Sequence, residues 1–187
     1  MALLFLIDLG LRRAELAGLR VRDIDLSRRQ VTVFGKGQKS RVIPLRGRIV
    51  HELEAYLLEP LPLVERQPEP DDFILYPEKR AGGGRLLAAY PKRRMSPPTV
   101  HRWWYRQAQA AGLVGAGMTS GLNMHRVRHS FATDLRRAAD LGAASQALGH
   151  SDLSTTSAIY GHYDLSDLER AMDALARVRR EREEPAD

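Results

Sequence analysis

Two short runs rich in β-branched residues, separated by a glycine-bearing loop, constrain the fold of this chain more than any other sequence feature. Residues 31–34 read Val-Thr-Val-Phe and residues 41–45 read Arg-Val-Ile-Pro-Leu. Two such runs around a short loop are typical of a β-hairpin, and Lys36 then lies at its turn. The rest of the chain is expected to be largely helical, so we predict a mainly helical α+β fold with a small antiparallel hairpin or sheet near residues 31–45.

Apolar residues recur at helical spacing on both sides of this hairpin. They predict two short helices over residues 2–9 and 12–19, broken near Gly10, so that Arg12 lies at a helix start. Further helices are expected over residues 47–58, 100–111, from 124, 143–148, from 154, and 166–182.

Single residues mark the ends of the later helices. Thr99 and Asn123 each precede a predicted helix and are expected to cap it, whereas Gly149 follows one and is expected to end it. Trp103 and Trp104 are adjacent, and neighbouring positions on a helix point about 100° apart. At most one of them is therefore expected to lie fully in the core.

Proline and glycine dominate the middle of the chain. Residues 73–76, Phe-Ile-Leu-Tyr, are predicted to form a short strand. Residues 78–98 combine glycine, proline and cations, and this composition predicts a mobile loop. The loop is interpreted either as an arm that contacts phosphates or as a surface insertion.

The side chains suited to catalysis are dispersed along the chain. Cleavage of a phosphodiester builds negative charge on the phosphate oxygens, which fixed arginines stabilise through planar, permanently charged guanidinium groups. A tyrosine phenol can attack the phosphorus, and lysine or histidine can move protons or hold charge. The candidate catalytic residues are Arg12, Lys36, His125, Arg128, His150 and Tyr160.

The local sequences around these residues carry a resemblance. They read Gly-Leu-Arg-Arg-Ala-Glu-Leu at 10–16, Gly-Lys-Gly at 35–37, His-Arg-Val-Arg-His at 125–129, Leu-Gly-His-Ser at 148–151 and Ile-Tyr at 159–160. In order and spacing this set resembles the tyrosine recombinase, or phage integrase, family from residue 2 to about residue 175. The resemblance implies the catalytic-domain fold of that family and a single catalytic domain over residues 1–187. It also implies that the N-terminal core-binding domain of the family is absent from this chain.

The resemblance also implies a role for each residue. Tyr160 resembles the nucleophile, which attacks the scissile phosphate to give a 3′-phosphotyrosyl enzyme and a free 5′-hydroxyl before strand exchange. The other roles carried over are two phosphate clamps (Arg12, Arg128), two active-site histidines (His125, His150), the hairpin lysine (Lys36) and an acidic residue that supports the first arginine (Glu15). No cofactor and no ATP are implied. Tyr163 is the rival nucleophile, because it lies only three positions beyond Tyr160.

One pair of histidines raises a metal hypothesis. His125 and His129 are four positions apart on a predicted helix, a spacing also found in zinc sites. The pair lacks the glutamate of the zinc-protease motif, and the chain contains no cysteine. We therefore predict no metal and interpret His129 as a supporting helix residue.

The charge of the chain fits a nucleic-acid partner. Lysine and arginine exceed aspartate and glutamate by 29 to 23, a net charge of +6, and the excess lies before residue 164. Such a field attracts a polyanion and makes binding sensitive to salt. Double-stranded DNA is the expected partner, and the candidate DNA-binding residues are Lys39, Arg41, Lys92, Arg93 and Arg94.

Three functions fit these observations. The first is a site-specific recombinase catalytic domain, the second a type IB topoisomerase that relaxes supercoils with the same chemistry, and the third a truncated, non-catalytic DNA-binding remnant. The C-terminal helix near 166–182 is expected either to dock on a neighbouring protomer of a tetramer or to pack on its own domain. The apolar start of the chain is too short for a membrane span and has no charged leader, so we expect a cytoplasmic protein.

Overall fold

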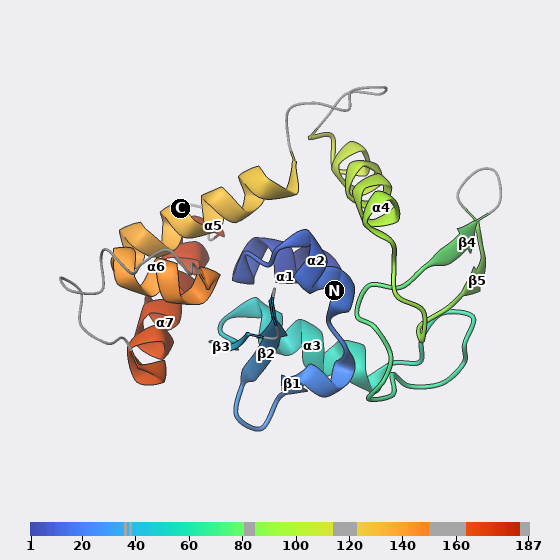
Figure 1. Ribbon diagram of the computed structural model, residues 1–187, viewed down its shortest axis with the longest axis horizontal. Helices are drawn as coiled ribbons and strands as arrows, with labels where there is room; N and C mark the ends of the chain where they lie inside the picture. Colours follow the sequence, from blue (N-terminus) through green and yellow to red (C-terminus); the bar gives the residue numbers. More distant parts are fainter. Residues whose placement is uncertain (36, 38, 81–84, 114–122, 150–163, 184–187) are drawn as a thin grey trace.

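The computed structural model describes residues 1–35, 37, 39–80, 85–113, 123–149 and 164–183. These residues form a mainly helical α+β fold, as predicted (Figure 1). The α-helices are α1 (Ala2–Leu9), α2 (Arg13–Gly18), α3 (Arg48–Leu58), α4 (Pro97–Ala110), α5 (Met124–Ala138), α6 (Leu141–Leu148) and α7 (Leu165–Glu183). The strands are β1 (Ile24–Asp25), β2 (Gln30–Phe34), β3 (Ser40–Pro44), β4 (Glu78–Arg80) and β5 (Leu86–Ala89), and a 3-10 turn covers Val21–Asp23.

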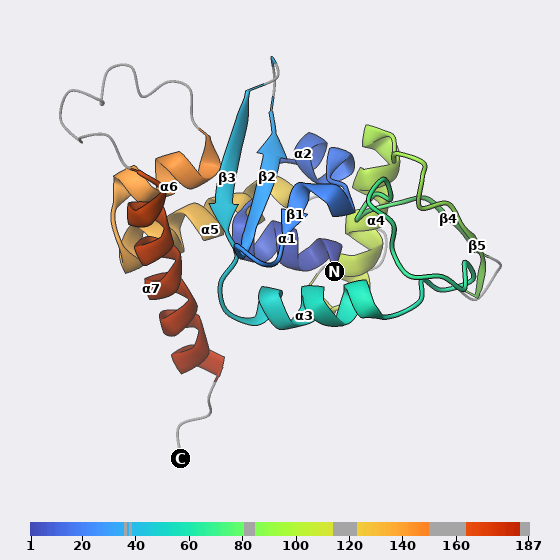
Figure 2. The ribbon, with the colours of Figure 1, turned by 90° about the horizontal axis from the view of Figure 1, so that it is seen from below.

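The predicted hairpin is confirmed. Strands β2 and β3 pair antiparallel with Val31 opposite Ile43 and Val33 opposite Arg41, and β1 extends them to a three-stranded sheet. Figure 2 shows α1 behind this sheet, α3 running across its lower end, and α6 and α7 beside β3. Both α6 and α7 contact β3, so these C-terminal helices pack beside a sheet formed by the N-terminal part of the chain.

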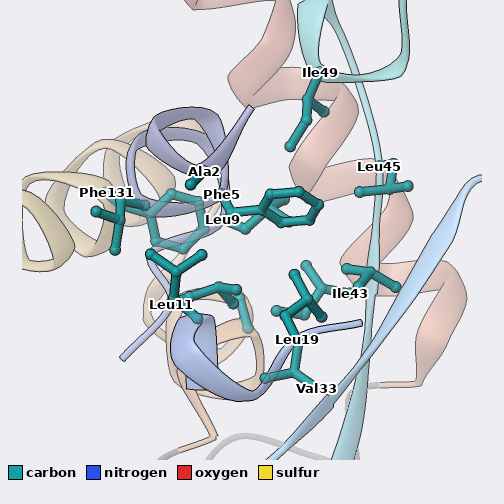
Figure 3. Close-up of a cluster of buried hydrophobic side chains, with 14 of the residues drawn as sticks. Ala2, Phe5, Leu9, Leu11, Leu19, Val33, Ile43, Leu45, Ile49 and Phe131 are labelled. Atoms are coloured by element: carbon teal, nitrogen blue, oxygen red, sulfur yellow. The ribbon is translucent and has the colours of Figure 1, made fainter. Parts of the chain in front are cut away.

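The core forms around α1, whose sequence is apolar on nearly every side. A helix of that kind has to be buried, and Phe5 and Leu9 have no exposed surface. Figure 3 shows these two side chains between Phe131 of α5 on one side and, on the other, Ile43 of β3 and Leu45, which directly follows β3. The helices and the sheet therefore share one hydrophobic core.

Gly10 ends α1 in the left-handed conformation, with φ at 60°. A Cβ atom at this position would lie 2.4 Å from a ring carbon of Phe131, so no other residue fits without moving the core. The turn at Gly10 lets the chain reverse into Arg12, which is the N-cap of α2 as predicted.

The start of α4 differs from the prediction, whereas its two tryptophans agree with it. Helix α4 begins at Pro97, and its cap is Ser96, whose Oγ accepts a hydrogen bond from the backbone N–H of Thr99. The prediction that Thr99 is the cap was wrong, because proline is favoured in the first helical turn and the cap must precede it. The expectation for the tryptophans is confirmed, since Trp104 is 3% exposed and its neighbour Trp103 is only partly buried.

Asn123 caps α5 as predicted, and its side chain accepts a hydrogen bond of 2.9 Å from the backbone N–H of Arg126. We expect Asn123→Ala to lower the free energy of unfolding by about 1 kcal/mol, the usual effect of losing an N-cap. Chemical denaturation followed by circular dichroism measures it. Ser130→Ala, an exposed change within the same helix, serves as the control and is expected to be nearly neutral; equal midpoints for the two variants would contradict the assignment of the cap.

Two predictions for the middle of the chain were wrong. Residues 73–76 do not form a strand: Phe73 makes one isolated bridge to Arg20, and Ile74 and Leu75 are buried within irregular chain. Residues 78–98 are not a continuous loop, because β4 and β5 pair antiparallel within them. Residues 81–84, between these strands, lie outside the described residues.

Helix α7 confirms the predicted C-terminal helix. Its apolar stripe packs on its own chain, where Leu168, Met172 and Leu175 are buried, and the helix contacts α5, α6 and β3. Of the two expectations for this helix, packing on its own domain is the one that the structure shows. Among the described residues, no helix is both long enough and apolar enough to cross a membrane.

Candidate active site

Arg12 and Glu15 form the first part of the candidate site, at the start of α2. The Glu15 carboxylate accepts a hydrogen bond of 2.8 Å from the backbone N–H of Arg12 and one of 3.0 Å from Arg12 Nη1. The first bond caps the helix, because it satisfies a backbone N–H that has no partner within it. Glu15 is buried, with 2% of its side chain exposed, whereas 44% of the Arg12 side chain is exposed. The guanidinium of Arg12 is therefore held by the buried Glu15 on one side and is open to solvent on the other.

Arg128, on α5, lies beside this pair and is buried. Its Nη1 donates a hydrogen bond of 2.5 Å to the carbonyl oxygen of Gly10, and its Nη2 donates one of 2.7 Å to that of Leu148. Burial, followed by the positive charge of Arg12, lowers the pKa of Arg128 to about 10, so the side chain stays charged at neutral pH. A guanidinium has five N–H donors, and these two bonds fix its plane.

The C-terminal end of α6 supplies the acceptors that bring the arginines together. The carbonyl oxygen of Leu148 accepts from both Arg12 Nη1, at 3.1 Å, and Arg128 Nη2, and that of Gly149 accepts from Arg12 Nη2 at 3.4 Å. The last carbonyls of a helix lack partners within it and carry partial negative charge, which favours cations. Gly149 itself ends α6 in the left-handed conformation, as predicted.

Arg41, on β3, completes the cluster. It donates to both oxygens of Glu15, at 2.8 and 2.9 Å, and its Nε donates to the carbonyl oxygen of Ala147 at 2.7 Å. Burial acts to raise the pKa of Glu15, but the hydrogen bonds and charge of Arg41, together with the bonds from Arg12, outweigh it and hold the pKa below its usual value. Of the two DNA-binding candidates on the hairpin, Lys39 is exposed but Arg41 is not.

The described part of the site is thus three guanidinium groups around one carboxylate and one helix end. Glu15 cancels one of the three positive charges. The remaining positive charge, on planar donors held in fixed positions, suits a tetrahedral or pentacovalent oxyanion of phosphorus. The arrangement can therefore bind a phosphodiester and stabilise charge that develops on it.

Three of the predicted catalytic residues, Lys36, His150 and Tyr160, lie outside the described residues. The predicted histidines of α5 are both described. His125 and His129 are exposed on the helix, and their rings meet edge to face with centroids 5.0 Å apart. Among the residues that the structure describes, no group of three His, Cys, Asp or Glu side chains is placed to hold a metal ion.

The basic segment before α4 is held against the protein. Lys92 forms an ion pair of 2.7 Å with Glu69, which raises the pKa of the lysine. Arg94 donates to the backbone carbonyl of Ala14 in α2, at 3.2 Å, and Arg93 is exposed. This segment therefore adds positive charge near the helix that carries Glu15.

Arg41 is the site residue that sequence reasoning misplaced, since it was expected only as a DNA contact. A signal was present in the strand pattern. Arg41 shares the inward face of the hairpin with Val31, Val33 and Ile43, all buried, because alternate residues of a strand point the same way. A charge on the core face is unfavourable unless it is paired. The position of Arg41 on this face could therefore have predicted a buried acidic partner.

The family model described as "Phage integrase family" matches residues 1–166 of this chain. The chain is 36% identical over 148 residues to the tyrosine recombinase XerC of Actinobacillus pleuropneumoniae serotype 7 (strain AP76), an alignment that covers 79% of this chain and 42% of the relative. It is also 36% identical over 148 residues to the tyrosine recombinase XerD of Yersinia pestis, covering 79% of this chain and 44% of the relative. This chain thus spans less than half the length of either relative.

Solved structures show the same fold. The XerH site-specific recombinase, in a pre-cleavage complex with its difH substrate, superposes with a TM-score of 0.54 and 28% identity, covering 91% of this chain and 44% of that one. The integrase of mycobacterium phage Brujita superposes with a TM-score of 0.59 and 23% identity, covering 94% of this chain and 50% of that one. With the arginine cluster in place and the family model matched over most of its length, the chain belongs to the phage integrase family.

Proposed function

We propose that this chain is the catalytic domain of a site-specific DNA recombinase, which cleaves and rejoins DNA strands through a 3′-phosphotyrosyl intermediate. The observation that carries the proposal is the pairing of Arg12 and Arg128 on the carbonyl oxygen of Leu148, with Glu15 beneath them. Two guanidinium groups held side by side suit the two non-bridging oxygens of one phosphodiester. Family membership and the likeness to XerC and XerD support the same activity.

In the proposed reaction, the phenol oxygen of Tyr160 attacks the scissile phosphorus. One P–O bond forms to tyrosine as the P–O bond to the 5′-oxygen breaks; the phenol loses its proton and the leaving oxygen gains one. Lys36, His125 and His150 are the proposed groups for holding charge and moving these protons. Because the new phosphodiester keeps the bond energy, a second 5′-hydroxyl can reverse the attack without ATP.

The arginines lower the barrier because the phosphate oxygens carry more negative charge in the transition state than in the substrate. Arg128 is fixed by two backbone carbonyls and Arg12 by Glu15, so neither has to be reorganised when the charge develops. An environment arranged in advance in this way is the usual source of electrostatic catalysis. Activation of the tyrosine must come from such cations or from a base, since a phenol with a pKa of about 10 is almost fully protonated at neutral pH.

Double-stranded DNA is the proposed substrate. XerH is described as bound to its difH substrate, and the net charge of +6 on this chain favours a polyanion. A homo-oligomer on DNA, such as a tetramer, stays a prediction. Because the apolar stripe of α7 is already buried within this chain, the contacts between protomers would have to use other surfaces. A protein with this activity works where the DNA is, so the cytoplasm remains the expected location.

The proposal is tested by trapping the covalent intermediate. The chain is incubated at low salt with duplexes nicked just downstream of the scissile position and randomised in sequence around it, so that the short 5′-hydroxyl fragment diffuses away. We expect a denaturing gel to show protein linked to the strand labelled at its 5′ end and not to the strand labelled at its 3′ end. The polarity follows because tyrosine keeps the 3′-phosphate.

Absence of any adduct from the folded chain would contradict the proposal. An adduct with the label reversed would show a 5′ linkage and would contradict the mechanism. Relaxation of supercoiled plasmid without exchange between two recovered sites would instead favour the topoisomerase alternative.

A further inference from the structure

Arg41 is an inward-facing charge on a strand whose other inward residues are apolar. Its partner across the sheet is Val33, and Ile43 is the next residue of β3 on the same face; both are buried. Only 14% of the Arg41 side chain is exposed. A side chain in this position is poorly placed to grip a DNA backbone, so its role has to lie inside the protein.

The contacts of Arg41 satisfy Glu15. The carboxylate accepts four hydrogen bonds, of which two come from Arg41 and two from Arg12. A carboxylate has about four lone-pair sites, so these bonds fill them. Without Arg41, two acceptor sites of a buried charge would lose their donors, and the nearest other cations are the arginines proposed to bind phosphate.

Arg41 also fixes the helix end on which those arginines rest. Its Nε binds the carbonyl oxygen of Ala147, one residue before Leu148. A Cβ atom on Gly149 would lie 3.0 Å from Arg41 Cδ, which shows how closely the side chain packs against the end of α6. Gly149 directly precedes His150 in the sequence. One side chain from the hairpin thus holds both the carboxylate and the carbonyls that orient the site.

We propose that Arg41 is a positioning residue of the cleavage reaction: it saturates Glu15 and locks the end of α6, so that Arg12 and Arg128 are aimed at the scissile phosphate. The inference rests on the proposed function, because it assigns Arg41 a part in that same site. It places Arg41 apart from the arginines that would touch DNA, since each of its three nitrogen atoms donates a hydrogen bond to the protein.

Loss of Arg41 has an electrostatic signature. The charged groups that face Glu15 among the described residues are Arg12 at its own helix start, Arg41 from β3 and Arg128 from α5. With Arg41 replaced by glutamine, burial of the carboxylate is less opposed, and the pKa of Glu15 rises. As pH falls through that raised value, Glu15 takes up a proton and Arg12 loses its anchor. Cleavage by the variant should therefore fall on the acid side at a pH where the wild type is unaffected.

The experiment compares Arg41→Gln, Arg41→Lys and the wild-type chain in the trapping assay, with rates measured at saturating DNA across pH. We expect Arg41→Gln to cleave about tenfold to a hundredfold more slowly, the scale of a misaligned reactive group, with a much smaller change in the DNA dissociation constant. The acid-side loss should move to higher pH and disappear in Arg41→Gln combined with Glu15→Gln. Arg41→Lys, which keeps the charge but not the two-pronged contact, should recover only part of the rate.

Arg46→Gln is the matched control. Arg46 lies just after β3 and pairs with Glu169 and Asp173 of α7, away from Glu15, so its rate and pH profile should match the wild type. If Arg41→Gln behaves like Arg46→Gln while the wild type cleaves, the inference is overturned and the proposed function stands. Should Arg41→Gln fail to fold, Arg41→Lys carries the test, and a wild-type rate and pH profile in that variant would overturn the inference.

A wild-type chain that forms no adduct overturns the proposed function and, with it, the role of Arg41 in cleavage. The structural part of the inference is then decided without DNA, by a carbon-13 NMR titration of the Glu15 carboxyl. A raised pKa in Arg41→Gln supports Arg41 as the partner that saturates Glu15. An unchanged pKa overturns that role as well.

Discussion

Replacing Tyr160 with phenylalanine is expected to abolish the protein–DNA adduct completely while leaving DNA binding intact. Phenylalanine keeps the ring and removes only the phenol oxygen, the atom proposed to form the bond to phosphorus. A tyrosine that replaced it, such as Tyr163, would form the same linkage, so loss of the adduct identifies Tyr160 as the nucleophile. The denaturing gel measures the adduct, and fluorescence anisotropy with the same duplex measures binding.

Tyr163→Phe is the matched control, because it makes the same chemical change three residues away. It should form the adduct at a rate close to that of the wild type. The reverse pattern, in which Tyr160→Phe still forms the adduct and Tyr163→Phe does not, would move the nucleophile to Tyr163.

The second large effect is expected for Arg128→Ala, which should lower the cleavage rate on the order of 10² to 10³, as for removal of one oxyanion donor. The buried guanidinium is charged and is fixed by the carbonyl oxygens of Gly10 and Leu148. It can therefore stabilise the negative charge that develops on the phosphate without first having to reorient. Single-turnover rates at saturating DNA measure the loss. Arg128→Lys should recover little, because a point charge cannot reproduce the planar fork.

The same substitution leaves the carbonyl oxygen of Gly10 without its Arg128 donor, whereas that of Leu148 keeps the bond from Arg12. A buried carbonyl that loses its donor costs about 1 to 3 kcal/mol. Thermal denaturation of Arg128→Ala therefore has to accompany the rates, which are compared below its melting temperature. Arg136→Ala, an exposed change in the last turn of α5, should leave the rate unchanged. A rate for Arg128→Ala within a few-fold of that control would remove Arg128 from the site.

Sequence patterns predicted the parts of the fold that depend on local periodicity. The hairpin followed from two β-branched runs, and α1, α2 and α6 followed from apolar spacing with a glycine at an end. Gly10 shows why this works: a left-handed residue between two helices has a local signature. The single-residue cap at Asn123 was predictable for the same reason.

The sequence misled where composition and tertiary contacts disagree. Residues 78–98 carry the glycines, prolines and cations of a loop, yet β4 and β5 pair through their backbones, and composition does not report such pairing. Residues 73–76 are apolar because Phe73, Ile74 and Leu75 are buried, not because they form a strand. A short apolar run therefore predicts that its side chains are buried, but it does not by itself predict a strand conformation of the backbone.

For the described part of the candidate site, the sequence predicted which residues to consider but not their geometry. Arg12, Glu15 and Arg128 lie together as their sequence contexts implied, whereas the partnership of Arg41 with Glu15 joins residues 26 positions apart and depends on strand register. The carbonyls of α6 that hold the arginines have no sequence signature, since every residue has one.

Those carbonyls make the site more sensitive to the length of α6 than to its composition. Substitutions in this helix keep the backbone oxygens in place as long as the new side chains fit. Deleting or inserting one residue would instead turn the helix end by about 100° and shift it by about 1.5 Å, which moves the acceptors at Ala147, Leu148 and Gly149 away from all three arginines. Active descendants of this chain should therefore accumulate point changes in α6 while its residue count stays constant.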